Sequence, residues 1–405
     1  MPASVALYHA VLARLQAATA GRVRKTSVVR LALLVSGVLL AQSCVLARVA
    51  EALAGLPLSS ARWPESLERR LRRTLRDPGL EPATCLAPLL AAALDWPALR
   101  RGGRRLVLAA DDSSHTDRVH LFRVSLCYRG GSLPLAWATW PQQVPLAAGE
   151  YWRRVEAVLD AAAALLPPGV PVLVCADRAF DVPAFARRVA ARGWHWAVRA
   201  KAGGQLRFRD YRGREWRLGD LVAAHLRARG QRYKARGAAF KKAGWLAASV
   251  VAHWAPGQRE RLVVLTDLPP DWEVLRAYDR RFWIEPGFRA TKSSGWRWEQ
   301  CQVRAPQAHR RLLLALAIAD LLTLALGRDE AAQQRDARAA RPAGGRPRPA
   351  RLSLFTLGLR RLLRDLRANL PPRLSWWLGN PDGPSWNAEW LGAQAHYLIF
   401  QSVRS

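Results

Sequence analysis

The sequence predicts a mixed α/β core that is interrupted by a β-rich insertion and preceded by an all-α N-terminal region. Residues 1–103 place apolar side chains at helical spacing. From residue 104, apolar strand-like runs alternate with helical patterns, which is typical of a mixed sheet flanked by helices. Residues 203–261 break this alternation with a glycine-, arginine- and aromatic-rich stretch. At 405 residues the chain is long enough for two or three domains.

The N-terminal region, residues 1–103, contains a strongly basic helical pattern. Leu67, Leu71 and Leu75 form one apolar stripe, and five arginines cover the other faces of the same helix. A basic helix beside a helical hairpin suits DNA docking of helix-turn-helix character. A solvated helix that packs on the catalytic core is an equal alternative.

One apolar stretch, residues 31–47, raises the question of a membrane span. It is shorter than the roughly 20 residues that a span needs, and polar residues interrupt it. We interpret it as two packed helices with a turn near Gly37. The N-terminus also lacks a secretory cleavage pattern, so we expect a cytoplasmic, nucleoid-associated protein without a membrane partner.

The first part of the core, residues 104–202, has acidic residues where two apolar strands end. The strand at residues 105–112 ends in Asp111 and Asp112, and the buried strand at residues 170–177 ends in Asp177. Ligands and metals usually gather at the carboxyl edge of an open α/β sheet. Each acid also has a plainer interpretation, as a turn or helix-capping residue.

The remaining chain divides by composition into four segments. Residues 203–261 form the insertion, whose interleaved basic and aromatic residues suit contacts with phosphates and bases, although an exposed loop is an alternative. Residues 262–326 return to the core. Residues 327–350 read as a flexible linker, and residues 351–405 as a helical segment with a tryptophan-rich end (Trp376, Trp377, Trp386 and Trp390).

Within the second part of the core, residues 278–292 carry four functional side chains at fixed spacing. At about 100° per residue, Arg281 and Glu285 return to the helical face of Tyr278, and Lys292 lies near it. Such a face suits a phosphate backbone and a metal ion. The alternative is a solvated face with i, i+4 ion pairs. Pro286 is expected to kink the segment.

The net charge favours a protein that binds a polyanion, and the cysteine spacing argues against a zinc-binding or disulfide-bonded protein. The formal net charge of +32 indicates a polyanionic partner, with nucleic acid as the first candidate. The five cysteines are scattered, odd in number and never spaced C-x-x-C, so the sequence indicates neither a zinc site nor a disulfide framework. Most are expected to be small buried residues.

The separated carboxylates suggest metal-dependent phosphoryl transfer. Two Mg²⁺ ions roughly 3.5–4 Å apart can activate a nucleophile and stabilise the leaving oxygen. Mg²⁺ prefers oxygen ligands and keeps several waters, so two or three carboxylates suffice. Asp111 or Asp112, together with Asp177 and Glu285, can supply them.

With these residues in order, the chain resembles the DDE transposases of bacterial insertion sequences, in the group with the Y-x2-R-x3-E-x6-K signature. Tyr278, Arg281, Glu285 and Lys292 match that spacing in full. The sequence ADRAFD, which contains Asp177, is similar to the second-aspartate motif of the family, and ADDSS is similar to the first. The resemblance covers roughly residues 104–326.

The resemblance implies a fold, a cofactor and a set of partners. The fold is a ribonuclease H-like core with a β-rich insertion between the second aspartate and the glutamate. Because the ligand in the first motif precedes the hydroxyl residue, the resemblance favours Asp112 over Asp111. The expected cofactor is a pair of Mg²⁺ ions, with Mn²⁺ as a substitute. The expected partners are double-stranded DNA, as transposon ends and target, and a second copy when bound to DNA.

The resemblance also assigns roles within the site. Asp112, Asp177 and Glu285 are expected to be the catalytic metal ligands, and Tyr278, Arg281 and Lys292 to grip the phosphates near the cleaved end. The predicted activity is cut-and-paste transposition at the terminal inverted repeats. Two alternatives remain: an inactive or repurposed DNA-binding protein, and a structure-selective nuclease that hydrolyses DNA without strand transfer.

Overall fold

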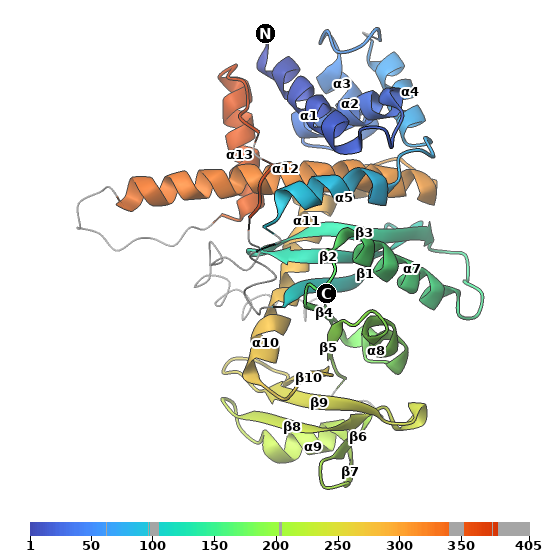
Figure 1. The fold of residues 1–405 in the computed structure, drawn as a ribbon, viewed down its shortest axis with the longest axis vertical. Helices are drawn as coiled ribbons and strands as arrows, with labels where there is room; N and C mark the ends of the chain where they lie inside the picture. Colours follow the sequence, from blue (N-terminus) through green and yellow to red (C-terminus); the bar gives the residue numbers. More distant parts are fainter. Residues whose placement is uncertain are drawn as a thin grey trace.

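A computed structural model of the chain shows a mixed sheet with helices on both faces and a helical group stacked beyond one edge of the sheet (Figure 1). It describes residues 1–61, 63–95, 97, 105–201, 205–339, 352–374 and 376–379. Two predicted boundaries, near residues 103 and 203, lie outside the described residues. So do Trp386 and Trp390 of the predicted tryptophan-rich end.

The N-terminal region is helical over its described residues. Leu67, Leu71 and Leu75 are buried, which confirms the predicted apolar stripe. The helices are α1 (Ala3–Thr19), α2 (Lys25–Ala41), α3 (Leu46–Leu53), α4 (Pro64–Thr74) and α5 (Pro82–Ala93).

The apolar stretch at residues 31–47 does form two packed helices, but the predicted turn near Gly37 is wrong. Helix α2 continues through Gly37, and the break falls at residues 42–45. A Cβ atom at Gly37 would lie 2.5 Å from Cγ1 of Val49, so this glycine lets α3 approach α2 closely. In the described part of the chain, no single helix is long and apolar enough to cross a membrane. Helices α2 and α3, bent by 93°, meet that test only as a pair.

The ten-stranded sheet has the order β3-β2-β1-β4-β5-β10-β9-β8-β6-β7. Strand β1 runs antiparallel to β2 and parallel to β4, and β4 runs parallel to β5. The strands are β1 (Leu106–His115), β2 (Val119–Tyr128), β3 (Gly131–Pro141), β4 (Val172–Ala176), β5 (His195–Arg199), β6 (Arg207–Asp210), β7 (Glu215–Arg217), β8 (Arg232–Ala239), β9 (Leu246–His253) and β10 (Leu262–Thr266).

The segment predicted as a β-rich insertion continues the core sheet. Strands β6, β7, β8 and β9 fall within residues 203–261, and β9 pairs with β10, which in turn pairs with β5. Helix α9 (Leu218–His225) and the short 3₁₀ turn η2 (Lys241–Ala243) complete this part. The insertion therefore lengthens one sheet in a single direction, away from the N-terminal helices (Figure 1).

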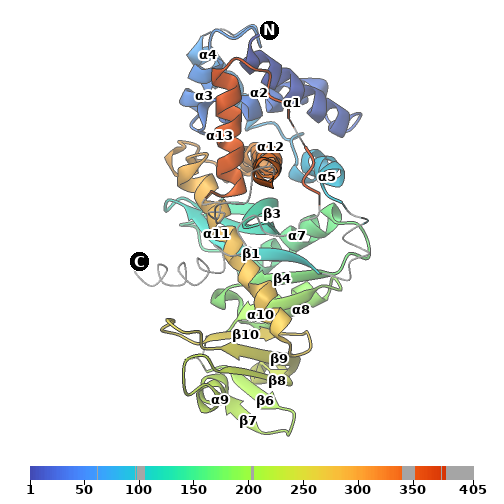
Figure 2. The same cartoon turned by 90° about the vertical axis from the view of Figure 1, so that its left-hand side faces the viewer.

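Helices cover both faces of the core strands. Helices α7 (Glu150–Leu165) and α8 (Pro183–Ala190) pack on one face, and α10 (Trp272–Asp279) and α11 (Ile284–Arg289) lie on the other. Figure 2 shows α10 and α11 running in succession across the strands β10 to β1. The second of these helices carries Glu285.

The segment that carries the predicted signature changes helix type twice. A 3₁₀ turn, η3 (Arg280–Trp283), separates α10 from α11, and a π turn, η4 (Ala290–Ser294), follows α11. Pro286 has no N–H to donate to the carbonyl of residue 282, so an α-helix cannot continue regularly through this point. In place of the kink expected at Pro286, the structure has the 3₁₀ turn η3, a tighter helix, shortly before this residue.

The predicted linker at residues 327–350 is wrong over its described part. Helix α12 (Pro306–Ala339) continues to residue 339, and the later residues of that linker lie outside the described part of the chain. Alanine, arginine and glutamine make up nine of the twelve residues 328–339, and all three favour helices. The tail then forms α13 (Leu354–Arg367).

Helices α12 and α13 cross with their backbones in contact. A Cβ atom at Gly327 would lie 1.8 Å from the carbonyl oxygen of Leu354, and one at Gly358 would lie 1.8 Å from that of Thr323. Only glycine allows this approach, because the neighbouring atoms belong to the backbone and cannot move aside.

Replacing Gly358 with alanine is therefore expected to destabilise the protein by about 1–3 kcal/mol through overpacking. Helix propensity alone predicts the opposite sign, a gain of about 1 kcal/mol. Urea unfolding measures the difference. Gly79→Ala is the control, since a Cβ there meets only the flexible side chain of Asp77, at 3.3 Å. A Gly358→Ala variant at least as stable as the parent would contradict the backbone contact.

Candidate active site

The parallel pairing of β1 and β4 brings two acids to one edge of the sheet. Ala110 of β1 lies opposite Ala176 of β4, so the following residues lie side by side: Asp111, still within β1, and Asp177, just after β4. Strand β4 ends at Ala176, and Asp177 caps the 3₁₀ turn η1 (Arg178–Phe180) by accepting a hydrogen bond from the backbone N–H of Ala179. The predicted strand-end acids are thus neighbours.

A single buried arginine connects these acids with Glu285. The Nη2 atom of Arg281 donates a hydrogen bond to Oδ2 of Asp111 at 3.0 Å and lies 3.9 Å from Oδ2 of Asp177. Its Nη1 atom lies 3.7 Å from Oε1 of Glu285, one helical turn away. We call Asp111, Asp177 and Glu285 the carboxylate cluster; it comes from three segments far apart in the sequence.

Asp112, the residue predicted for this position, lies on the opposite face of the sheet from the cluster. Successive side chains of a strand point to opposite faces of a sheet. Asp111 faces η3, whereas Asp112 faces α7, where Tyr151 donates a hydrogen bond to its Oδ2 atom at 2.6 Å. The Nε2 atom of His120 lies 2.8 Å from the other oxygen. Asp111 therefore takes the place in the cluster that the resemblance gave to Asp112.

The electrostatics of the cluster depend on burial and on the guanidinium. Burial raises the pKa of Asp111 to about 6, although the charge of Arg281 opposes the shift. Burial also raises the pKa of Glu285, again against Arg281. For Arg281 burial acts in the opposite direction, but the carboxylates, Asp111 first, hold its pKa above the ordinary value. The arginine thus opposes the effect of burial on the acids, and the acids hold the arginine in its charged form.

The other two predicted phosphate-binding residues, Tyr278 and Lys292, contact protein groups in this structure. Tyr278 is fully buried, and its hydroxyl donates a hydrogen bond to the carbonyl of Ala176 at 3.1 Å. In this structure Tyr278 fixes the end of β4, next to Asp177. Lys292 lies in the π turn, with its Nζ atom 3.8 Å from Glu299. Its side chain is 25% exposed, so it remains accessible to a ligand.

Sequence reasoning missed a second cation next to the cluster. Arg123 of β2 lies opposite Asp111 of β1 and is 1% exposed. Its guanidinium stacks on the ring of Phe288 at 3.7 Å and lies 3.5 Å from Oγ1 of Thr291. The position of Arg123 inside an apolar strand was the signal in the sequence for such a cation. A buried cation needs a nearby acid or aromatic ring.

The donor atoms of the carboxylate cluster fit a hard divalent cation. All three donors are carboxylates, the ligands that Mg²⁺ and Mn²⁺ prefer, and they already face one positive group, the Arg281 guanidinium. Among the described residues, these three side chains do not form a group whose ligand atoms all lie within 4.8 Å of one another. The arrangement thus has the chemistry of a metal site, with a side-chain cation between the ligands.

Comparison with known proteins identifies the segment that carries most of this site. Residues 153–322 match the transposase DDE domain. The match contains Asp177 and Glu285, together with Tyr278, Arg281 and Lys292, and it begins after Asp111 and Asp112. A transposase DDE domain implies an enzyme that cleaves DNA and transfers strands, and such domains generally depend on divalent metals.

One solved structure similar to this chain is the piggyBac transposase, in a cryo-EM structure of its synaptic complex with hairpin DNA. The TM-score is 0.41 and the sequence identity is 8%, over 92% of this chain and 83% of the other. No curated protein matches the chain.

Proposed function

We propose that this chain is a DNA transposase that binds the terminal inverted repeats of its insertion sequence and catalyses cut-and-paste transposition. The observation that carries the proposal is the carboxylate cluster, in which acids from β1, from the end of β4 and from α11 face one buried arginine. The family match over residues 153–322 and the net charge of +32 point to DNA as the substrate.

Asp111, Asp177 and Glu285 are proposed to hold two Mg²⁺ ions, for which Mn²⁺ can substitute. Such ions, when bound, activate a water or a 3′ hydroxyl and stabilise the leaving oxygen of the phosphodiester. The chain itself supplies the positions of the ligands. Parallel pairing fixes Asp111 beside Asp177, and the Tyr278 hydrogen bond to Ala176 fixes the end of the strand before Asp177.

Arg281 is proposed to keep the cluster assembled before metal and DNA arrive. Three acids in a mostly buried place repel one another, and a bound cation or a guanidinium relieves that repulsion. Once ions neutralise the acids, the guanidinium is available for a phosphate oxygen, which it can bind in bidentate form. Lys292, with its partly exposed ammonium, is proposed to contact a phosphate as a point charge.

The DNA-binding surface is proposed to include the insertion strands and helix α4. In the insertion, arginines stack on aromatic rings: Arg214 lies 3.9 Å from the ring centroid of Trp216, and Arg209 lies 4.9 Å from that of Trp245. Tyr211, at the β6–β7 turn, is 72% exposed. Cations beside exposed rings suit phosphate contact and base stacking. We propose that two copies act together on paired transposon ends.

The strand order supports the ribonuclease H-like core that the resemblance implies. The order β3-β2-β1-β4-β5 combines two antiparallel pairings with two parallel ones. It places the first two acids on adjacent central strands. The β-rich segment lies between Asp177 and Glu285 in the sequence, as the resemblance implies.

The test uses the purified full chain and a labelled DNA fragment that carries the inverted repeats flanking its coding region. We expect cleavage at the repeat ends in Mg²⁺ or Mn²⁺, none in EDTA, and joining of the freed 3′ ends to a target plasmid. Binding without cleavage would favour a repurposed DNA-binding protein, and cleavage without joining would favour a nuclease. Either outcome overturns the proposed transposition.

A further inference from the structure

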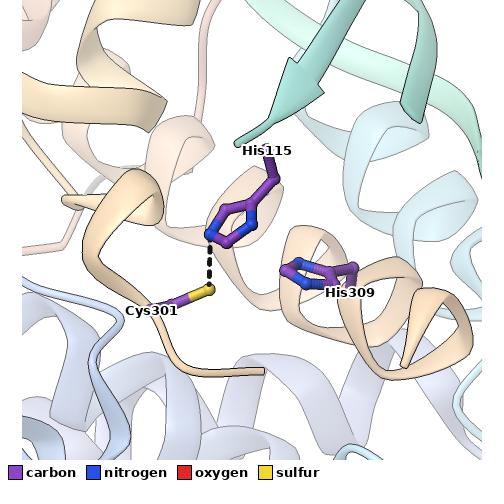
Figure 3. A group of neighbouring side chains, drawn as sticks. All are labelled: His115, Cys301 and His309. Atoms are coloured by element: carbon purple, nitrogen blue, oxygen red, sulfur yellow. Dashed lines mark hydrogen bonds between the residues drawn. The ribbon is translucent and has the colours of Figure 1, made fainter. Parts of the chain in front are cut away.

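A buried group of thiols and imidazoles lies at the junction of four segments. It comprises Cys44 (between α2 and α3), His115 (the end of β1), Cys301 (after η5, Trp298–Gln300) and His309 (α12). We call these four residues the Cys/His cluster. All are at most 5% exposed. Among the described residues, three members (His115, Cys301 and His309) form the group whose potential ligand atoms all lie within 4.8 Å of one another (Figure 3).

We propose that the Cys/His cluster is a structural Zn²⁺ site that joins the N-terminal helices to the core. Two cysteines and two histidines are a common ligand set of structural zinc sites. Two thiolates balance the charge of the ion, so the bound site is neutral, as a buried position requires. Thiolate and imidazole ligands also select Zn²⁺ over Mg²⁺, which separates this site from the carboxylate cluster.

The separation between His115 and Cys301 already suits a shared ion. The Nε2 atom of His115 lies 3.4 Å from Sγ of Cys301 (Figure 3). Tetrahedral geometry with the usual Zn–S and Zn–N bond lengths places two such ligand atoms about 3.5 Å apart. The other ring nitrogen of His115, Nδ1, is buried and has no hydrogen-bond partner.

His309 has the hydrogen bond that orients a metal-binding histidine. Its Nε2 atom donates to the backbone carbonyl of Val303 at 2.8 Å, which leaves the lone pair on Nδ1. A backbone carbonyl on the second nitrogen is the usual way to fix the tautomer of a ligating histidine. In this structure the indole N–H of Trp298 occupies that lone pair, at 3.0 Å. A cation would take its place.

Cys44 supplies the fourth ligand from the N-terminal region. Its thiol interacts with the thiol of Cys301. Its backbone N–H donates to the carbonyl of Trp296 at 2.7 Å, which ties the α2–α3 connection to the segment after η4. This bond holds the backbone of Cys44 close to the segment that leads to Cys301.

A route for the ion is present. A cleft of about 1030 Å³ lies between helices α3 and α4 and the core, and both His115 and Cys301 line it. The cleft thus reaches two of the four members of the cluster. The site stands independently of the proposed transposition, because none of its residues belongs to the carboxylate cluster.

The test measures metal binding by the full chain, purified without a metal-affinity tag. We expect about one Zn²⁺ per chain by elemental analysis, and after exchange with Co²⁺ the charge-transfer absorption of cobalt bound to thiolate. Cys301→Ser and His115→Asn are expected to abolish that absorption and to lower Tm. Cys85→Ser, which alters a buried cysteine of α5, and Asp177→Asn are expected to keep both the absorption and the bound metal.

The proposal is overturned if the parent chain binds neither ion, or if the absorption survives both cluster substitutions. A Cys44–Cys301 disulfide in place of the metal, seen as the loss of two hydrogens in the intact mass, would also overturn it. If Cys301→Ser does not fold, the proposal is tested by cysteine alkylation in the parent chain alone. Bound Zn²⁺ must then slow alkylation of Cys44 and Cys301 but not that of Cys85, and equal rates with and without Zn²⁺ refute the site.

Discussion

Replacing Asp111 with asparagine is expected to reduce DNA cleavage on the order of 10³-fold or more, while Asp112→Asn is expected to reduce it at most about 10–100-fold. The larger effect is typical of removing a group that stabilises charge in the transition state. The smaller effect is typical of a residue that only supports the site. Asp111 faces Arg281 and Asp177, whereas Asp112 bonds to Tyr151 and His120 on the opposite face.

The measurement is the single-turnover rate of end cleavage in Mg²⁺ and in Mn²⁺. Asparagine preserves the size of the side chain, so gel-shift affinity for the same DNA is expected to stay unchanged in both variants. Tyr151→Phe, which removes a partner of Asp112 without touching Asp111, is the matched control and should resemble Asp112→Asn. A greater loss in Asp112→Asn than in Asp111→Asn would restore the assignment that the family resemblance favoured.

Replacing Arg281 with methionine is expected to destabilise the metal-free protein by about 3–5 kcal/mol, as does removal of one partner from a buried ion pair. The arginine side chain is 10% exposed, and the acids around it would lose their common positive partner. A divalent cation should restore part of the loss, by about 2.7 kcal/mol at one hundred times its Kd. Urea unfolding in EDTA and in Mn²⁺ measures both effects.

Arg361→Met provides the control for this prediction. The Arg361 side chain is 12% exposed and lies 3.9 Å from Glu330 and 3.8 Å from Asp365, outside the carboxylate cluster. The Arg361→Met variant is expected to be less stable than the parent, and Mn²⁺ is expected to restore none of the lost stability. Equal recovery in both variants, or none in Arg281→Met, would show that the acids around Arg281 do not form a cation site.

The ambiguity between Asp111 and Asp112 shows what sequence reasoning could not decide. Strand β1 is buried on both faces over residues 106–110, so its apolar residues do not alternate with polar ones. Without alternation, the sequence does not tell which of two adjacent acids faces which side. The strand and its acidic end were predictable from the apolar run, but the face depends on the helices that pack against each side.

The signature segment was only partly predictable for a related reason. Spacing places Tyr278, Arg281 and Glu285 on one helical side, and in the structure Arg281 and Glu285 do lie near each other. Spacing does not say which residues of that side lie beneath the sheet edge. Tyr278 is buried there and contacts the backbone of β4. Burial depends on the packed fold, so the spacing within one helix does not predict it.

The prediction from composition was least accurate in a segment that combines linker-type and helix-forming residues. Residues 327–350 contain the glycine and proline of a linker together with a run of helix-forming residues. Gly327 counted toward the linker, although it allows α13 to cross α12. The Cys/His cluster lay beyond sequence reasoning because its members come from segments as far apart as residues 44 and 309.

The continuity of the sheet has a mechanical consequence. Backbone hydrogen bonds link β3 to β7 without a break, so the outermost strands cannot pivot as a separate domain would. DNA held at the far tip would therefore be held at a set distance from Asp111 and Asp177. The position of the cut along the duplex would then depend on the number of strands between the DNA contact at the far tip and the two acids.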